Sequence, residues 1–228
     1  MTHSKRILLR LAPLLCLVPP IPGGCAQDRL QTEIQRLDRA WVEAQYTELP
    51  GEQREQRFKA LLADAEKLEL HHPGHAEPLA LQGLLLSSLA ATTANLDSLF
   101  HLEEARKRLE KSIALDPGAL NSSAQITLGA LFHCAPPLIS FRDDGKARHL
   151  FEDALERHPE TSDANYYLGA FLLEQGEFGP ALPYLEKAAH LLAQDDGRLD
   201  NRYFSQQAST LLIAARQRRI VELICAEP

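Results

Sequence analysis

Apolar residues recur every three to four positions along almost the whole chain after residue 27. Two of these stripes are formed by Leu30, Ile34, Leu37, Trp41 and Ala44, and by Phe58, Leu61, Leu62, Ala65 and Leu68. This spacing puts the apolar residues on one face of a helix. Alternating apolar and polar runs, which would indicate strands, do not reach a useful length. The pattern therefore predicts an all-α fold.

Proline punctuates the helical pattern at a nearly regular interval. Pro73, Pro117 and Pro159 are 44 and 42 residues apart, a period typical of helical repeat arrays. The helices before the last two prolines each carry small and large residues on one stripe, namely Ala105 and Leu109 in one and Ala147, Phe151 and Ala154 in the other. Small residues let two helices approach closely, and the large one fills the gap between them.

Glycine occupies one equivalent position in three of the expected first helices, at Gly83, Gly129 and Gly169. A glycine inside a helix costs about 1 kcal/mol relative to alanine, so three at one position imply close packing there. Leu-Gly followed three residues later by a large apolar residue, with the small-large-small stripe and proline after it, resembles the tetratricopeptide repeat. That resemblance implies a right-handed α-solenoid of helix-turn-helix repeats.

The repeat pattern divides the chain into four expected parts. We expect a signal peptide at 1–24, an N-terminal helix pair at 25–75, repeats at 76–193 and a C-terminal capping helix at 194–228, in which residues 200–225 form one long amphipathic helix. An exposed end of a solenoid core needs such a cap. Relative to the 34-residue norm, insertions of about 10 and 6 residues lie at 94–101 and 134–145.

The first 24 residues have the layout of a secretory signal peptide. A basic start is followed by an apolar run, Leu11–Val18, that is shorter than the roughly 20 residues needed to span a bilayer. Ile21-Pro-Gly-Gly-Cys25 resembles a bacterial lipobox, which implies lipidation of Cys25 and attachment to the membrane through that lipid. Gly24-Cys25-Ala26 also fits an ordinary small-x-small cleavage site, which would release a soluble periplasmic protein after Ala26.

A narrower resemblance rests on the middle and last repeats. Pro-Pro-Leu-Ile-Ser-Phe-Arg-Asp-Asp-Gly at 136–145, followed by Asp-Ala-Asn-Tyr-Tyr-Leu-Gly at 163–169, resembles exported tetratricopeptide lipoproteins similar to the T component associated with TRAP transporters. The resemblance covers roughly residues 76–193. It implies a periplasm-facing accessory that handles a ligand or a partner binding protein.

The repeat geometry places one set of side chains on the concave wall of the array. These candidate binding residues are Glu77, Leu84, Ser87, Ile126, His133, Asp163, Tyr166 and Leu173. We expect the wall to be mostly apolar and to suit a hydrophobic helix, a peptide or a lipophilic small ligand. The alternative is that these residues pack against the inserted loops and leave no open groove.

Composition limits the classes of partner. The chain carries 24 Lys and Arg against 31 Asp and Glu, a net charge of −7. Residues 1–24 hold three basic and no acidic side chains, so removing them gives −10. Such an acidic surface repels phosphate backbones and anionic lipid head groups. Nucleic acid is therefore excluded as a partner.

The candidate chemistry is sparse. His71, His72 and His75 crowd a helix end, but no cysteine or carboxylate stands at ligand spacing, so we expect no metal and no cofactor. The His133-Cys134 pair lacks a group that would orient a base, so we expect no enzyme activity; a thiol hydrolase is the remaining alternative. Cys134 and Cys225 are a candidate disulfide in an oxidising compartment, provided that the C-terminal segment folds back across the last repeat.

These observations predict a cell-envelope binding protein that recognises a partner protein or hydrophobic small ligand on its concave face, in the setting of a TRAP-type transporter. The alternative is an assembly scaffold that binds proteins and no small ligand. The sequence leaves oligomerisation open.

Overall fold

The computed structural model describes residues 24–92, 97–135, 141–194 and 197–226, with the side chains of 24–27 and 226 excepted. Within these residues the chain is all-α, as the apolar spacing predicts, and contains no strand. The expected signal peptide lies outside the described residues except for Gly24. The side chain of Cys25, the expected lipidation site, lies outside them too.

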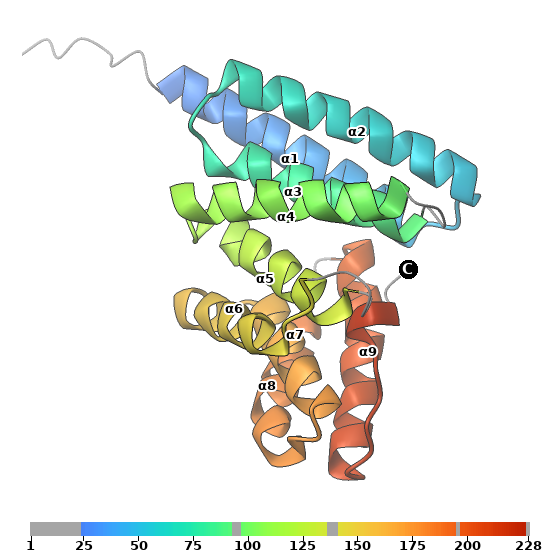
Figure 1. Cartoon of the computed structure of the whole chain (residues 1–228). Coiled ribbons are helices and arrows are strands. Elements are labelled where there is room, and N and C mark those ends of the chain that lie inside the picture. The colour runs from blue at the N-terminus through green and yellow to red at the C-terminus, as the bar shows by residue number, and fades with distance from the viewer. Residues whose placement is uncertain (1–23, 93–96, 136–140, 195–196, 227–228) are drawn as a thin grey trace, which may run out of the picture.

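The described residues form nine α-helices and a short 3-10 helix (Figure 1). They are α1 (Gly24–Tyr46), α2 (Gly51–His71), α3 (Ala76–Thr92), α4 (Asp97–Leu115), α5 (Ala119–Cys134), α6 (Asp144–Arg157), α7 (Ser162–Glu174), α8 (Phe178–Leu192), α9 (Leu199–Arg216) and η1 (Ile224–Ala226). The expected insertion at 94–101 is partly helical, because α4 already begins at Asp97.

Neighbouring helices pack in pairs, α3 with α4, α5 with α6 and α7 with α8. The second helix of each pair is held by an apolar stripe, which the sequence predicts for α4 and α6 and which α8 repeats. Its members are fully buried at Ala105, Leu109, Ala147, Phe151, Ala154, Ala181, Leu185 and Ala188. These residues join the first helices in one large core cluster, while α1, α2 and part of α3 form a second.

The three equivalent glycines lie where two helices of a pair approach most closely. A Cβ atom on Gly129 would lie 2.8 Å from Cε1 of Phe151, and one on Gly169 would lie 2.8 Å from Cγ of Leu185. A Cβ on Gly83 would overlap the side chain of Leu109. The packing reason expected for these glycines is therefore confirmed.

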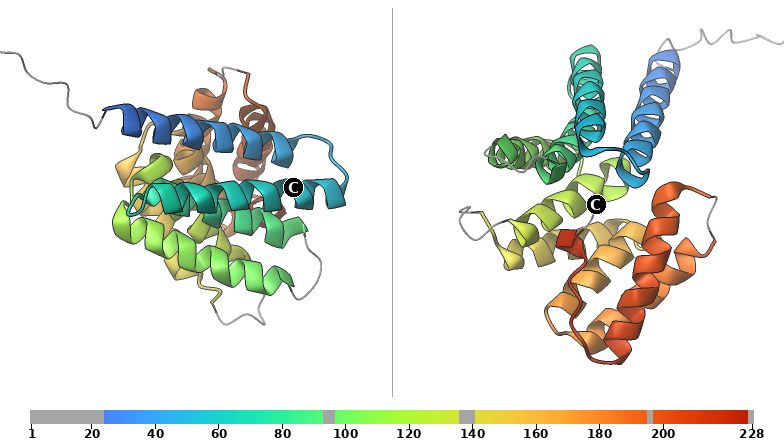
Figure 2. Two further views of the ribbon diagram at one scale, coloured as in Figure 1. Left: turned by 90° about the horizontal axis from the view of Figure 1, so that it is seen from above. Right: turned by 90° about the vertical axis from the view of Figure 1, so that its right-hand side faces the viewer.

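The first helices of the pairs line up with one another. Along the chain, α1 contacts α3, α3 contacts α5, α5 contacts α7, and α7 contacts α9. The array also bends so far that its two ends, α1 and α9, come into contact (Figure 2). The inner side of the array is therefore bounded at both ends by helices that touch, α1 and α9.

The C-terminal region differs from the expected single helix over 200–225. Helix α9 ends at Arg216, and the chain turns back to reach η1 (Figure 1). Two hydrogen bonds close the helix end, from the Arg218 amide to the Ala215 carbonyl and from the Arg219 amide to the Ala214 carbonyl. This is a Schellman ending with Arg218 in the left-handed region at φ 55°. The helix prediction was wrong here because arginine stands where glycine usually marks such an ending.

Candidate functional site

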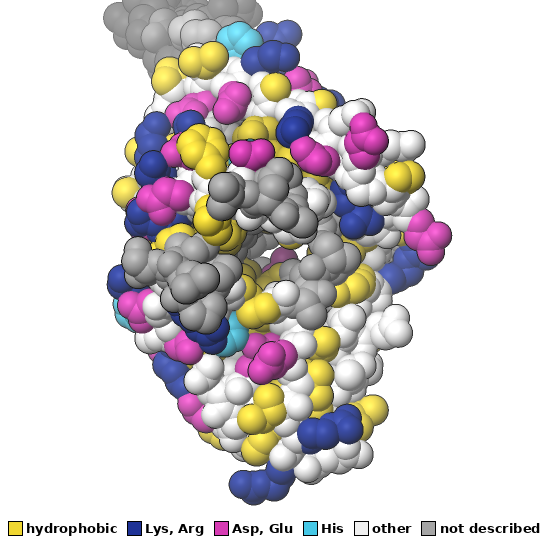
Figure 3. All heavy atoms as spheres, turned by 45° about the vertical axis from the view of Figure 1, so that its right-hand side comes forward, with side chains coloured by type: hydrophobic (Ala, Val, Ile, Leu, Met, Phe, Trp, Pro, Cys, Tyr) yellow, Lys and Arg dark blue, Asp and Glu magenta, His cyan; other side chains and the backbone are white. Residues whose placement is uncertain are grey.

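A cavity of about 550 Å³ lies on the inner side of the array. Residues from α1, α3, α5, α7, α9 and the turns that precede α7 and α9 line it. Figure 3 shows the surface hollowed near its middle, with acidic side chains visible at the hollow. Its volume falls within the range of small-molecule sites in proteins.

Three of the expected binding residues line this cavity, namely Leu84 on α3, Ile126 on α5 and Asp163 on α7. Two others belong to the core, since Tyr166 is 1% exposed and Leu173 is 0% exposed. The Tyr166 ring packs edge-to-face against the ring of Phe204 on α9, 4.9 Å between centroids. Tyr166 would face the concave wall in an isolated repeat, but here α9 covers it.

The remaining three expected residues also lie away from the cavity lining. Glu77 lies 3.8 Å from the His75 ring nitrogen, at the start of α3. The Ser87 hydroxyl donates to the Gly83 carbonyl oxygen of its own helix. His133 is buried in an ionic cluster described below. For Tyr166, Leu173 and His133, the assignment to an open concave wall is thus corrected.

The wall is more polar than the sequence suggested. Beside aliphatic residues, the lining contains four aromatic rings and a set of charged side chains, namely Trp41, Tyr46, Tyr167, Phe204, Asp38, Glu160, Asp163, Arg198 and Asp200. The expectation of a mostly apolar groove was therefore wrong. Most of the charged residues of the lining come from the turns and from the end helices α1 and α9. These segments lie outside the regular repeat positions from which the wall was predicted.

Arg198, directly before α9, organises the charged side of the cavity. Its guanidinium donates to both carboxylate oxygens of Asp200, with the shortest bond 2.8 Å from Nη2 to Oδ2. Its Nη1 also donates to Oδ2 of Asp38 on α1 at 3.1 Å. The hydrogen bond to Asp200, and then the charge of Asp38, raise the pKa of Arg198 above its usual range. This ion pair joins the two ends of the array.

Asp163 faces the cavity from the first turn of α7, and its side chain is accessible from within it. The surrounding protein raises the pKa of this carboxyl, and the nearby carboxylates of Asp200 and Asp38 raise it further. Of the described residues, only Ser162 donates a hydrogen bond to it, at 3.3 Å. Asp163 is thus a carboxylate held in a negative environment.

Another part of the wall has an unusual backbone. Leu120, Asn121 and Ser122 lie in the left-handed region at φ 51°, 55° and 64°, a conformation costing an L-residue roughly 1–2 kcal/mol. The turn is held by the Ser122 hydroxyl, which donates to the Pro117 carbonyl oxygen at 3.1 Å. Leu120 and Asn121 line the cavity. Strained backbone of this kind is common at ligand sites.

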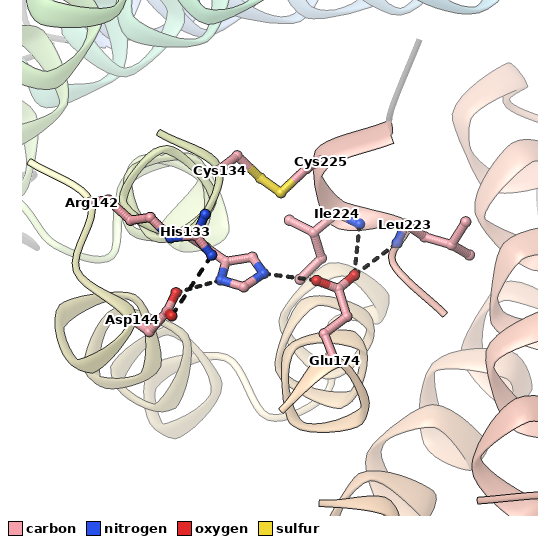
Figure 4. The surroundings of a disulfide bond; sticks show 8 residues. All are labelled: His133, Cys134, Arg142, Asp144, Glu174, Leu223, Ile224 and Cys225. Carbon is pink, nitrogen blue, oxygen red and sulfur yellow. Dashed lines mark hydrogen bonds and ion pairs between the residues drawn. A yellow bond between two sulfur atoms is a disulfide. The ribbon is translucent and has the colours of Figure 1, made fainter. Parts of the chain in front are cut away.

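A second cluster surrounds a disulfide between Cys134 and Cys225, whose Cα atoms are 5.3 Å apart (Figure 4). His133 lies beside it, with Nδ1 2.6 Å from Asp144 Oδ1 and Nε2 2.7 Å from Glu174 Oε2. The other oxygen of Glu174 accepts from two backbone amides of the returning C-terminal segment, at 2.8 and 3.0 Å. The cluster therefore fastens the C-terminus to α5 and α7.

Within the described residues, no three metal-binding side chains converge on one point. His72 and His75 have ring centroids 6.1 Å apart without a third partner of this kind. Of the helices in this part of the chain, none is long and apolar enough to cross a bilayer.

A comparison with protein-family models and one with curated proteins find no match to the chain.

The sequence reasoning missed the parts of the site contributed by α1 and by the start of α9. Asp38, Trp41, Arg198 and Asp200 lie outside residues 76–193, where the repeat geometry could be transferred. The one available signal was Trp41, the single tryptophan of the chain, on a stripe otherwise filled by aliphatic residues.

Proposed function

We propose that this chain is a ligand-binding protein of the cell envelope and that the cavity inside the helix array is its binding site. The observation that carries this proposal is the 550 Å³ cavity, to which both ends of the array contribute. A preformed concave space with a few convergent polar groups is the usual form of a small-molecule site.

We also propose that the helices are arranged as a tetratricopeptide-like right-handed solenoid. Three observations support it: the helix pairs, the buried small-large-small stripes, and the close-approach glycines at one equivalent position. The contact between α1 and α9 would turn this solenoid into a nearly closed ring with an interior cavity. Helical repeats commonly bind partners on their concave side.

The cell-envelope setting is also part of the proposal. It is supported by the signal-peptide layout of residues 1–24, by the lipobox-like sequence that ends at Cys25, and by the disulfide, since such bonds persist in oxidising compartments. The protein would attach to the membrane through a lipid on Cys25 and serve as an accessory of a TRAP-type transporter. It would act by binding; the alternative of a thiol hydrolase lacks its nucleophile, because the sulfur of Cys134 forms the disulfide.

Native mass spectrometry of the exported, purified chain tests the binding site. A Leu84→Trp substitution places a larger ring on the cavity wall, while Leu70→Trp makes the same change on the outer face of α2, where Leu70 is 79% exposed. We expect a retained small ligand in the wild type and in Leu70→Trp, and its loss in Leu84→Trp.

The alternative is a scaffold for an envelope protein complex, and one observation favours it. Leu99 and Phe100 at the start of α4 are 42% and 65% exposed. An apolar pair on the outside suits a protein contact. If purified protein carries no ligand and binds a partner protein through Phe100, with Leu84→Trp having no effect, the scaffold function replaces the proposed one.

A further inference from the structure

We infer that the cavity binds a small organic cation, an amine or a quaternary ammonium compound. This inference rests on the proposed function, because it names the ligand class of the same cavity. It follows from the balance of charge in the wall, the position of the aromatic rings and the size of the space.

The charged groups of the wall do not balance. With their carboxyl groups ionised, Asp38, Asp163 and Asp200 carry three negative charges against one positive charge on Arg198. Glu160, also at the wall, has its own partner in Lys187 at 2.7 Å. Asp163 and Asp200 lie in the first turns of α7 and α9, and each helix N-terminus supplies about half a positive charge. About one negative charge remains.

Asp163 is the aspartate of this wall for which the described residues supply no cationic partner. Arg198 already donates to Asp200 and to Asp38, so its hydrogen-bonding fork is directed at those two residues. Among the described residues, none forms an ion pair with Asp163, and Ser162 is its one donor. A cationic head group that reached Asp163 would form the pair that the protein does not supply. An amine would pair with this carboxylate through charge and N–H hydrogen bonds, whereas a quaternary ammonium group, which has no N–H, would pair with it through charge alone.

Aromatic rings line the same cavity. Trp41 and Tyr46 come from α1, Tyr167 from α7 and Phe204 from α9. The Trp41 indole is held in place because its Nε1 donates to the Ser88 hydroxyl at 2.9 Å. Ring faces attract ammonium groups, most strongly where water is excluded. Acidic and aromatic side chains together are suited to an organic cation.

The space suits a small molecule better than a chain segment. The cavity has a volume of about 550 Å³, and the Asp38–Arg198 ion pair crosses between α1 and α9 at its edge. A helix of a partner protein is about 10 Å wide with its side chains and would have to separate these ends. Within the described residues no third ligand joins the carboxylates to hold a metal ion. The geometry therefore points to a compact organic cation.

The position of Trp41 supplies the test. It is the single tryptophan of the chain and lines the cavity, so its fluorescence reports binding there directly. We would titrate the purified chain with choline, with putrescine and with 3,3-dimethylbutan-1-ol, the neutral isostere of choline, and repeat each titration by calorimetry. We expect both cations to change the Trp41 emission and to bind at least about tenfold more tightly than the neutral alcohol.

Two charge-matched variants identify the group responsible. Asp163→Asn removes the unpaired carboxylate, whereas Glu156→Gln removes one charge from an exposed position on α6 outside the cavity lining. We expect Asp163→Asn to weaken choline binding by about ten- to a hundredfold through loss of charge attraction, and Glu156→Gln to leave it within about twofold. Circular dichroism would check that both variants keep the helical fold.

The outcomes separate this inference from the function on which it rests. If the neutral alcohol binds as tightly as choline, or if Asp163→Asn binds choline normally, the cation inference is overturned while the cavity remains a binding site. If no probe changes the Trp41 emission and native mass spectrometry finds no retained ligand, the proposed function falls as well.

Discussion

His133 Nε2 lies 2.7 Å from Glu174 Oε2, and the two side chains are only 6% and 3% exposed. The residues are 41 positions apart and belong to α5 and α7, so this ion pair links two neighbouring repeats. Glu174 also accepts the amides of Leu223 and Ile224. One buried pair thus fixes the packing of two helices and the path of the C-terminal segment.

Because both ring nitrogens of His133 face carboxylate oxygens, only the protonated ring can donate to both. The hydrogen bond to Glu174, and secondarily that to Asp144, raises the pKa of His133 above its ordinary value of 6.5, against the opposing effect of burial. A raised pKa in the folded state means that the stabilisation is complete below pH 6.5 and is lost as the pH rises through the raised value.

We therefore expect the free energy of unfolding of the wild type to fall relative to that of His133→Gln as the pH rises above 6.5 and through the raised pKa of His133. Urea unfolding at several pH values in both proteins measures the difference. The other histidines are common to both proteins, so their contributions cancel in the comparison. If the stability of the wild type relative to His133→Gln increased with pH, the assignment of a protonated His133 ring would be contradicted.

The Cys134–Cys225 disulfide joins residues separated by 91 positions. Closing so long a loop removes much of the freedom of the unfolded chain, and native disulfides typically contribute about 2–4 kcal/mol. We expect reduction, or the double substitution Cys134→Ser and Cys225→Ser, to lower the free energy of unfolding by about that amount. Reductant should not change the double variant, which serves as the control. Equal stability of the oxidised and reduced wild type would refute this role.

The helix pairs of this fold could be predicted from the sequence because they pack through residues that are close in the chain. Apolar stripes such as Ala147, Phe151 and Ala154, and glycines such as Gly129, reflect packing between adjacent segments, and that packing is encoded in local spacing. The disulfide partners could be named for the same kind of reason, since few cysteines are available. The helix pairs followed from these local patterns.

The residues that line the cavity could not be predicted in this way. Asp38 and Arg198, which are 160 positions apart, meet only because the array bends until α1 contacts α9. The bend is the sum of small rotations between successive helix pairs, and such rotations leave no local pattern in the sequence. For the same reason Tyr166 was assigned to an open wall, whereas α9 covers it with Phe204. Long-range closure decides which wall residues remain accessible.

The close approach at Gly129 gives a direct test of the repeat packing. An alanine there would place its Cβ 2.8 Å from the Phe151 ring, which is itself fully buried and has little room to move. Overpacking of this kind typically costs about 1–3 kcal/mol. We expect Gly129→Ala to lower the free energy of unfolding by that amount, measured by urea titration. Gly179→Ala, in the first turn of α8 with open space around it, should be neutral or slightly stabilising. Equal effects of the two substitutions would contradict the packing argument.

The endings of α7 and α9 offer a matched pair for the cost of a left-handed residue. Both have the same two closing hydrogen bonds, with Gly176 at φ 77° in one and Arg218 at φ 55° in the other. A side chain in this conformation costs roughly 1–2 kcal/mol. A cation–π contact offsets part of this cost, because the Arg218 guanidinium lies 5.7 Å from the centroid of the Phe178 ring. Such a contact contributes about 0.5–1 kcal/mol at an exposed site.

Comparing Arg218→Gly with Arg218→Ala removes that contact from both proteins and leaves the backbone difference. We expect the glycine variant to be more stable than the alanine variant by about 1 kcal/mol. The reverse change, Gly176→Ala, should cost a similar amount, since no atom lies within 4 Å of the added Cβ and only the backbone conformation is strained. Urea unfolding of the four proteins measures both differences. If alanine were tolerated at residue 218 but not at residue 176, the chain after Arg216 would not turn through a Schellman ending, and the segment leading to Cys225 would follow another path.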